Sequence, residues 1–185
     1  MKLPTADVKP GNANLWGDLL EALTGVMKSG QFIMGPQVKA FEQETAQYLG
    51  VKHAIGVNSG TDALVLALRA AGIGAGNEVI TSPFTFFATA EAVSQVGATP
   101  VFVDIEPITF NINAQLIEPV INERTKAILP VHLFGHAAEL DPVMELAKKY
   151  GVRVIEDAAQ AFGAEYKREK IGSGGDAGCF SFFPT

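Results

Sequence analysis

The sequence predicts an α/β fold in which helices cover both faces of a mainly parallel sheet, preceded by an N-terminal helical arm. From residue 53 onward, short apolar runs alternate with stretches of helical period. The runs are apolar throughout rather than at every second position, which is typical of strands buried on both faces. The 19 glycines and 10 prolines fall mostly between the runs, where the turns of such a fold are expected.

The first 50 residues are predicted to form the helical arm. Apolar residues recur with a helical period over residues 15–29, and Gly30 ends this helix. A second, amphipathic helix is predicted over residues 38–49. The link between them, residues 32–36, is apolar and irregular, so we expect it to pack against another surface, such as a neighbouring subunit.

Residues 51–185 are predicted to form one domain whose parallel strands are joined by right-handed crossovers. The predicted strands lie at residues 54–57, 78–81, 100–103, 127–131, 152–155 and 179–183. The predicted helices lie at residues 61–71, 86–96, 114–121 and 142–150. Residues 162–178 are rich in glycine and lack a helical period, so we expect a loop or hairpin there.

Composition and charge exclude several classes of function. A chain of 185 residues with 48% hydrophobic residues can bury one sizeable core. A net charge of −6 argues against a protein that binds nucleic acid or an anionic membrane. No stretch approaches the roughly 20 apolar residues of a membrane helix, and the first residues lack the apolar segment of a secretory signal. The single cysteine, Cys179, excludes an internal disulfide and is expected to be buried and inert, so a cytoplasmic location is expected.

Open parallel sheets bind ligands at the carboxyl ends of their strands. The first such position is Asn58 to Asp62, which joins a predicted strand to a helix. Gly60 allows close approach of a ligand to the backbone, the helix N-terminus favours an anion, and Thr61 adds a hydroxyl donor. These residues therefore suit a phosphate, although an ordinary cap by Ser59 or Thr61 is the commoner structure for this pattern alone.

The second position carries three phenylalanines, Phe84, Phe86 and Phe87, at a junction between a strand and a helix. At least one ring must point towards the strand ends, where it is able to stack on a planar ligand. Packing in the core is the commoner role for any one of them.

The third position, Glu156-Asp157, places two carboxylates after the buried run 152–155, and Gln160 follows. A carboxylate there requires a partner, which a cationic ligand nitrogen would supply. A helix cap by Asp157 and a metal site are the alternatives. A metal site has too few ligands, because His132 is the only other candidate. His132 itself either faces a ligand or is a satisfied structural histidine.

The fourth position is Ser181, in the aromatic run that ends the chain. Its hydroxyl is able to donate to a phosphate, while the alternative is an aromatic core strand.

No single one of these four positions is decisive, but the order in which they follow one another along the chain is specific. The sequence resembles the DegT/DnrJ/EryC1/StrS sugar aminotransferases, a family of fold-type-I pyridoxal-phosphate enzymes. The blocks that carry the resemblance are residues 32–36, 58–64, 83–90, 131–135, 155–160 and 180–185.

The resemblance implies a fold-type-I large domain and assigns cofactor-binding roles. Gly60 and Thr61 would hold the phosphate of pyridoxal 5′-phosphate, with Ser181 as a further donor. Phe86 would stack on one face of the pyridine ring, and Ala159 would pack near the other.

Two further roles concern the edge of the cofactor ring. Asp157 would pair with the pyridine nitrogen, and Gln160 would hydrogen-bond the phenolic oxygen. A carboxylate beside that nitrogen keeps it protonated, which makes the ring an electron sink. No metal is implied.

The family's catalytic lysine forms a Schiff base with the cofactor and directly follows the motif that here ends at Thr185. Lys167 and Lys170 lie in the glycine-rich segment and do not match the motif. We therefore expect no catalytic residue within residues 1–185, with the lysine immediately after Thr185. The chain is then either a portion of a longer protein, without its C-terminal small domain, or is interrupted at a modified lysine. Residues 1–185 alone are expected to be inactive.

The resemblance favours transfer of an amino group, with glutamate as the expected donor, to a nucleotide-linked keto-sugar in polysaccharide biosynthesis. It also implies a homodimer with shared active sites. The alternatives are a sugar dehydratase or a ring-forming synthase of the same fold, and a non-catalytic regulatory homologue. A nicotinamide-binding Rossmann enzyme is disfavoured, because the glycine-rich run at residues 72–76 follows a helix rather than a strand.

Overall fold

A computed structural model describes residues 9–183 of the chain. These residues form two compact units. The first holds the residues up to 48 together with 52–56 and 183, and the second holds 49–51 and 57–182. All the predicted site residues belong to the second unit.

The first unit contains helices α1 (Lys9–Ser29) and α2 (Pro36–Leu49). Both helices begin earlier than predicted. The predictions started at the first residue of the apolar period, and the residues before it in each helix do not follow that period. Pro36 occupies the first position of α2, where its missing N–H costs nothing. The apolar link between the helices is exposed in this single chain, with Ile33 88% exposed.

The strand predicted at residues 54–57 does not form. Its apolar side chains are not buried, since Ile55 is 79% exposed. The amide of Gly56 donates to Oε1 of Glu42 at 2.8 Å. A side-chain carboxylate, and not the carbonyl of a neighbouring strand, is thus its hydrogen-bond acceptor. This prediction was wrong because an apolar run alone does not supply a partner strand.

The second unit is built on a five-stranded parallel sheet, as the sequence predicts. Its strands follow the order β2-β1-β3-β4-β7, and every pairing between neighbours is parallel. The bounds are β1 Glu78–Thr81, β2 Thr99–Phe102, β3 Thr125–Ile128, β4 Arg153–Asp157 and β7 Ala177–Cys179. The last strand begins and ends earlier than predicted, with its end at Cys179 rather than at residue 183.

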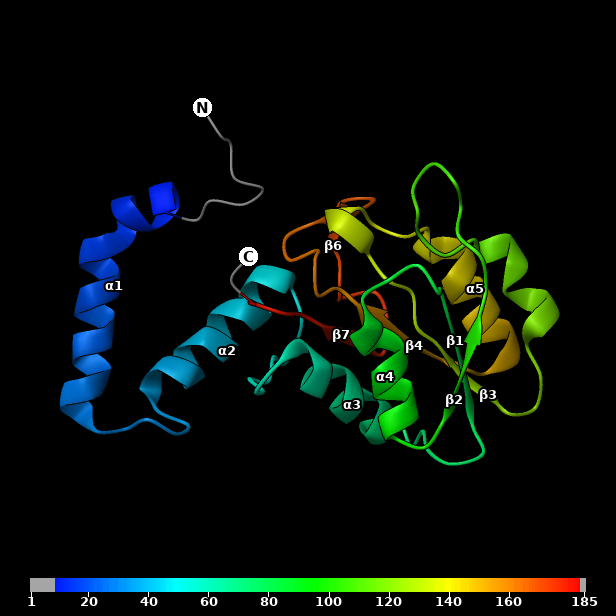
Figure 1. The fold of residues 1–185 in the computed structure, drawn as a ribbon, viewed down its shortest axis with the longest axis horizontal. Coiled ribbons are helices and arrows are strands. Elements are labelled where there is room, and N and C mark those ends of the chain that lie inside the picture. The colour runs from blue at the N-terminus through cyan, green and yellow to red at the C-terminus, as the bar shows by residue number, and fades with distance from the viewer. Residues whose placement is uncertain (1–8, 184–185) are drawn as a thin grey trace. The chain divides into compact units, whose positions relative to one another are not determined.

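Helices cover both faces of this sheet, with α3 (Gly60–Ala70) and α4 (Phe87–Gln95) on one face and α5 (Leu140–Tyr150) on the other (Figure 1). Alternation along β4 shows the division. Ile155 packs with α3 and α4, whereas Val154 packs with α5. The helix predicted at 114–121 is instead two 3₁₀ turns, Ala114–Leu116 and Glu118–Val120. Pro119 lies in the second turn and lacks the N–H that would continue an α-helix.

The glycine-rich segment forms the predicted hairpin, β5 (Glu165–Tyr166) paired antiparallel with β6 (Glu169–Lys170). The backbone then passes very close to itself. A Cβ atom on Gly178 would lie 2.4 Å from the Cα of Gly172, so this position does not accommodate a side chain without a shift of the neighbouring backbone.

The next residue, Cys179, is buried as predicted, and burial raises the pKa of its thiol to about 12. None of the helices within residues 9–183 has both the length and the apolar character that crossing a membrane requires.

Candidate functional site

Asp157 ends β4, an inner strand between β3 and β7, at the carboxyl edge of the sheet. Its amide donates to the Pro130 carbonyl at 2.9 Å, and its own carbonyl accepts from the His132 amide at 2.9 Å. On the other side, the Ala158 amide donates to the Cys179 carbonyl at 2.8 Å. The segment that follows β3 and the end of β7 therefore flank Asp157 and fix its backbone.

The Asp157 side chain points to the face covered by α4 and is only 4% exposed. Its Oδ2 accepts from the Thr89 hydroxyl at 2.7 Å, and its Oδ1 accepts from the Ala159 amide at 3.2 Å. Burial raises the pKa of this carboxyl, while the two hydrogen bonds oppose that rise. Each oxygen retains a lone pair, so the group is suited to a cationic partner.

Glu156 points to the opposite face, because side chains alternate along a strand. It is fully buried and accepts from four donors. They are Nε2 of His132 at 3.0 Å and the amides of Gly172 (2.8 Å), Gly174 (3.0 Å) and Gly175 (2.8 Å). Burial alone would raise the pKa of Glu156, but the bonds from His132, Gly172 and Gly175 outweigh it, and the pKa lies below its usual range. The partners of Glu156 are therefore groups of the protein itself, and this carboxylate holds the glycine-rich segment.

His132 is a satisfied structural histidine, one of the two roles considered from the sequence. It is fully buried, and its Nδ1 accepts from the Ala138 amide at 3.0 Å. Because Nδ1 accepts, the ring proton lies on Nε2 and points to Glu156. No nitrogen is left for a ligand.

Gly60 and Ser181 come together from distant parts of the sequence. A Cβ atom on Gly60 would lie 2.8 Å from the Cβ of Ser181 and 3.3 Å from its Oγ. Gly60 is the first residue of α3, and Ser59 caps the helix by accepting from the Asp62 amide at 3.0 Å. The cap is thus Ser59 and not Thr61. Within residues 9–183 the amides of Gly60 and Thr61 donate to no acceptor, as is usual in the first turn of a helix, and such amides favour an anion.

Gln160 is exposed, and its Oε1 accepts from the Phe134 amide at 2.8 Å. An amide N–H only donates, so this bond fixes the orientation of the side chain and leaves its NH₂ group as a donor. Phe134 has a φ of 55°, a strained conformation for an aromatic residue. This contact was not predicted, because nothing in the sequence pattern marks a left-handed phenylalanine.

Phe86 is the N-cap residue of α4 and is 72% exposed. It precedes Thr89 by three residues, and the Thr89 amide donates to its carbonyl at 3.1 Å. Residues three apart lie on the same side of a helix, so Phe86 is close to the end of the helix that contacts Asp157. Thr89 itself was not predicted, although its spacing from Thr85 at a strand-to-helix junction is a usable signal.

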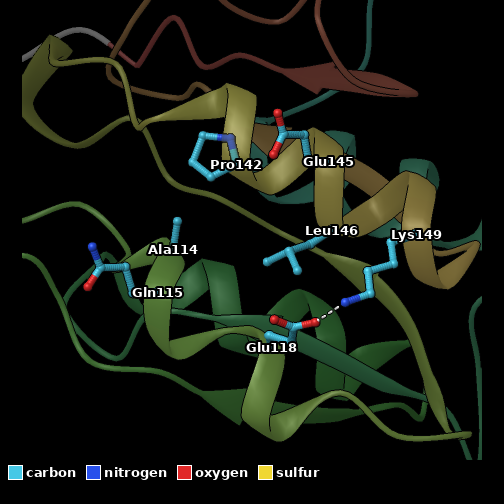
Figure 2. A pocket seen from close by; sticks show the side chains of 7 residues that line it. All are labelled: Ala114, Gln115, Glu118, Pro142, Glu145, Leu146 and Lys149. Atoms are coloured by element: carbon cyan, nitrogen blue, oxygen red, sulfur yellow. Dashed lines mark hydrogen bonds and ion pairs between the residues drawn. The ribbon is translucent and has the colours of Figure 1, made fainter.

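One pocket lies away from this edge, between the two 3₁₀ turns and α5 (Figure 2). Its walls include an ion pair between Nζ of Lys149 and Oε1 of Glu118 at 2.5 Å, and none of the predicted site residues lines it. Across the described part of the chain, no group of three or more histidine, cysteine, aspartate or glutamate residues is placed to hold a metal ion. The candidate site is therefore the carboxyl edge around Asp157.

Sequence comparison identifies relatives of the whole chain. It is 50% identical over 183 residues to a UDP-N-acetyl-3-dehydro-α-D-glucosamine 3-aminotransferase of Acidithiobacillus ferrooxidans, covering 99% of this chain and 50% of that protein. It is 48% identical over 185 residues to a pleiotropic regulatory protein of Geobacillus stearothermophilus, covering 100% of this chain and 50% of that protein. The chain thus spans about half the length of the curated relatives it matches.

Solved structures show the same fold. The Streptomyces venezuelae DesV structure has a TM-score of 0.97 at 45% identity, over 99% of this chain and 49% of that one. A 3-amino-5-hydroxybenzoic acid synthase has a TM-score of 0.84 at 34% identity, over 98% of this chain and 46% of that one. Residues 15–185 match the DegT/DnrJ/EryC1/StrS aminotransferase family. The chain therefore belongs to that family, as its six sequence blocks predict.

Proposed function

We propose that the protein containing this chain is a pyridoxal-phosphate-dependent aminotransferase that moves an amino group from glutamate to a nucleotide-linked keto-sugar. The observation that carries the proposal is the buried Asp157 carboxylate at the carboxyl edge of the sheet. The named activities of relatives support it, among them a dTDP-3-amino-3,4,6-trideoxy-α-D-glucose transaminase of Streptomyces venezuelae at 45% identity, over 99% of this chain and 48% of that protein.

The residues present fit the cofactor at two points. Gly60 and Ser181 lie so close that a Cβ atom on Gly60 would fill the space between them. The Gly60 and Thr61 amides at this point donate to no group of the described chain and are available to bind an anion. Asp157 offers a buried carboxylate for a protonated ring nitrogen. We propose that the helix N-terminus, with Ser181, holds the phosphate.

Two other residues complete the proposed site. Gln160, with its Oε1 engaged by Phe134, would donate from its NH₂ group to the phenolic oxygen of the cofactor. Phe86 and Ala159 would lie against the two faces of the ring. When bound, the cofactor supplies an electron sink for the carbanion of the amino donor.

The roles of the protein in the reaction follow from these contacts. Asp157 would keep a proton on the ring nitrogen, because a carboxylate held ionised beside it opposes proton loss. The buried position of Asp157 excludes water and strengthens this interaction. Gln160 and the helix N-terminus would fix the ring's orientation relative to the sugar.

We place the lysine that covalently holds the cofactor immediately after Thr185. The two nearest lysines within the described residues are already engaged on the β5–β6 hairpin. Nζ of Lys167 pairs with Asp141, and Nζ of Lys170 pairs with Glu165 at 2.8 Å.

The test compares the full-length protein with residues 1–185. Each is incubated with pyridoxal phosphate, reduced with borohydride and mapped by mass spectrometry, and transamination from glutamate is assayed in parallel. We expect one adduct, at the residue after Thr185, with turnover by the full-length protein alone. An adduct at a lysine within 1–185 together with turnover would overturn this assignment.

A second candidate is a synthase or dehydratase of the same fold, supported by the structural similarity to 3-amino-5-hydroxybenzoic acid synthase. A histidine in place of the lysine after Thr185 would favour a dehydratase. A regulatory homologue without catalysis is the third candidate, and the name of the Geobacillus relative supports it. The absence of any turnover by a protein that nevertheless binds the cofactor would favour it.

We further propose a cytoplasmic homodimer. The exposed apolar link around Ile33 supports a subunit contact, and the single buried cysteine suits a reducing compartment. Light scattering of the full-length protein is expected to give the mass of two chains. The Ile33→Asp variant is expected to shift that mass towards one chain, and an unchanged dimer would exclude the link from the contact.

The Gly60→Ala variant is expected to bind the cofactor much more weakly. Its Cβ atom would meet the Cβ of Ser181 at 2.8 Å, so Ser181 must move out of the anion site. Such overpacking costs about 1–3 kcal/mol. Gly17→Ala is the matched control, because no atom lies within 4 Å of the position that a Cβ atom would take there. The titration of cofactor absorbance measures both variants, and equal affinities would contradict the proposed cradle.

A further inference from the structure

Thr89 is a fully buried threonine in the first turn of α4, and its hydroxyl contacts Asp157 rather than its own helix. A buried helical threonine commonly donates to the carbonyl four residues earlier. Here Oγ1 lies 2.7 Å from Oδ2 of Asp157, across a separation of 68 residues. The contact therefore joins α4 to the end of β4 at the candidate site.

The direction of the hydrogen bonds follows from the chemistry of the groups. An ionised carboxylate only accepts, so Thr89 donates to Asp157. Oγ1 of Thr85 lies 2.9 Å from Oγ1 of Thr89. Since the Thr89 proton is used, Thr85 is the donor in this second bond. The result is a chain of donors, from Thr85 to Thr89 to Asp157.

The carboxyl group is thereby held at both oxygens. The Ala159 amide fixes Oδ1, and the Thr89 hydroxyl fixes Oδ2. Bonds to an ionised acceptor are roughly twice as strong as neutral ones, so this chain favours the charged carboxylate over the acid. Burial acts in the opposite sense and raises the pKa of Asp157, and the Thr89 hydrogen bond opposes that rise.

We propose that Thr89 is a positioning residue for the cofactor site: with Thr85 behind it, its hydroxyl orients the Asp157 carboxylate and keeps it ionised to receive a cationic ring nitrogen. This inference rests on the proposed pyridoxal-phosphate function. Thr89 acts through Asp157 and touches no reacting atom.

The titratable groups around Asp157 are few within the described residues. Glu156 is adjacent on β4, His132 comes from the segment after β3, and Cys179 comes from β7. From α4, the Thr89 hydroxyl is the group that bonds to the carboxyl. A change in the titration of Asp157 caused by a Thr89 substitution is therefore attributable to this hydroxyl.

The test uses the full-length protein with three variants. Thr89→Val keeps the shape and removes the donor, while Thr89→Ser keeps the donor. Thr81→Val is the matched control, because Thr81 is also fully buried and donates to a backbone carbonyl, that of Leu129, at 2.8 Å. Cofactor affinity is measured by absorbance titration of the apoprotein, and the pH dependence of the bound cofactor's absorbance is recorded.

Thr89→Val is expected to weaken cofactor binding about 10- to 100-fold, the effect of one hydrogen bond to a charged group. The pH profile of the bound cofactor should shift with it. Thr89→Ser is expected to remain close to the unsubstituted protein, and Thr81→Val to lose stability without losing affinity. If Thr89→Val and Thr81→Val lose equal stability and neither changes the affinity or the pH profile, the hydroxyl is structural only and the proposal fails.

A second measurement separates this inference from the proposed function. Carboxyl ¹³C NMR of the apoprotein follows the titration of Asp157 directly, without cofactor or turnover. Thr89→Val is expected to move that titration to higher pH, and Thr81→Val is not. An unsubstituted protein that fails to bind pyridoxal phosphate would refute the proposed function. An unmoved Asp157 titration would refute the role of Thr89, whether or not the cofactor binds.

Discussion

Asp157→Asn is expected to reduce transamination by the full-length protein on the order of 100- to 1000-fold, the typical effect of removing one preorganised electrostatic group from an active site. Asparagine has nearly the same shape as aspartate but no charge, so it does not hold a proton on the ring nitrogen. The substituted protein is expected to bind the cofactor with an altered absorbance. Steady-state kinetics and absorbance spectra are the measurements.

The same substitution is expected to leave the apoprotein at least as stable at neutral pH. The folded-state pKa of Asp157 is raised by burial, so the folded state binds its proton more tightly than the unfolded state does. The stability that this proton contributes is present at low pH and is lost as pH rises through the folded pKa. Above that point the charged carboxylate costs stability, and asparagine removes this cost. Loss of activity with retained stability is thus the signature of a functional carboxylate.

Asp104→Asn is the control, because Asp104 is exposed and its Oδ1 accepts from its neighbour, the Ile105 amide. Unfolding by urea measures the stability of both apoproteins. The idea is contradicted if Asp157→Asn retains activity within about tenfold, which is about 1.4 kcal/mol of the barrier.

Glu156→Ala is expected to destabilise the protein by about 3–5 kcal/mol, because it leaves buried partners without their charged acceptor. The donors that lose it are His132 and the amides of Gly172, Gly174 and Gly175. Total stability of a domain is only about 5–15 kcal/mol, so the variant is close to unfolding at room temperature. Thermal and urea unfolding of the apoprotein measure the loss.

Glu165→Ala is the control, because Glu165 is an exposed carboxylate paired with Lys170 and such pairs contribute about 0–1 kcal/mol. Acid should reproduce part of the Glu156 effect. The folded pKa of Glu156 is lowered, so its contribution is complete above the unfolded value of about 4.3 and is lost as pH falls through the folded pKa. A Glu156→Ala protein as stable as the Glu165→Ala protein would refute the role assigned to Glu156.

The parallel sheet was predictable because continuously apolar runs such as 78–81 and 152–155 fit strands buried on both faces. The errors have local causes. The run at 54–57 has no strand partner, and Pro119 interrupts a segment with a helical period. Both depend on hydrogen bonds, which hydrophobicity does not report.

The candidate site was predictable to a similar degree. The position of Asp157 at a strand end follows from the rule for parallel sheets. The divergence of Glu156 from Asp157 follows from strand alternation, but which of the two faces α4 depends on the tertiary fold. The bond from Thr89 to Asp157 spans 68 residues, and Phe134 adopts a backbone conformation that its residue type disfavours. Contacts of these two kinds are visible only in three dimensions.

The meeting of Gly60 with Ser181 has a consequence for biogenesis. About 120 residues separate the two halves of the proposed anion site, which is on the order of 10 s of translation at ribosomal rates. During that interval the N-terminus of α3 exists without the serine that faces it. The nascent chain is therefore expected to acquire phosphate affinity abruptly, when β7 and Ser181 leave the ribosomal tunnel and β7 pairs with β4. Free pyridoxal phosphate would then stabilise this part of the nascent chain only after β7 has paired with β4, by binding the assembled phosphate site.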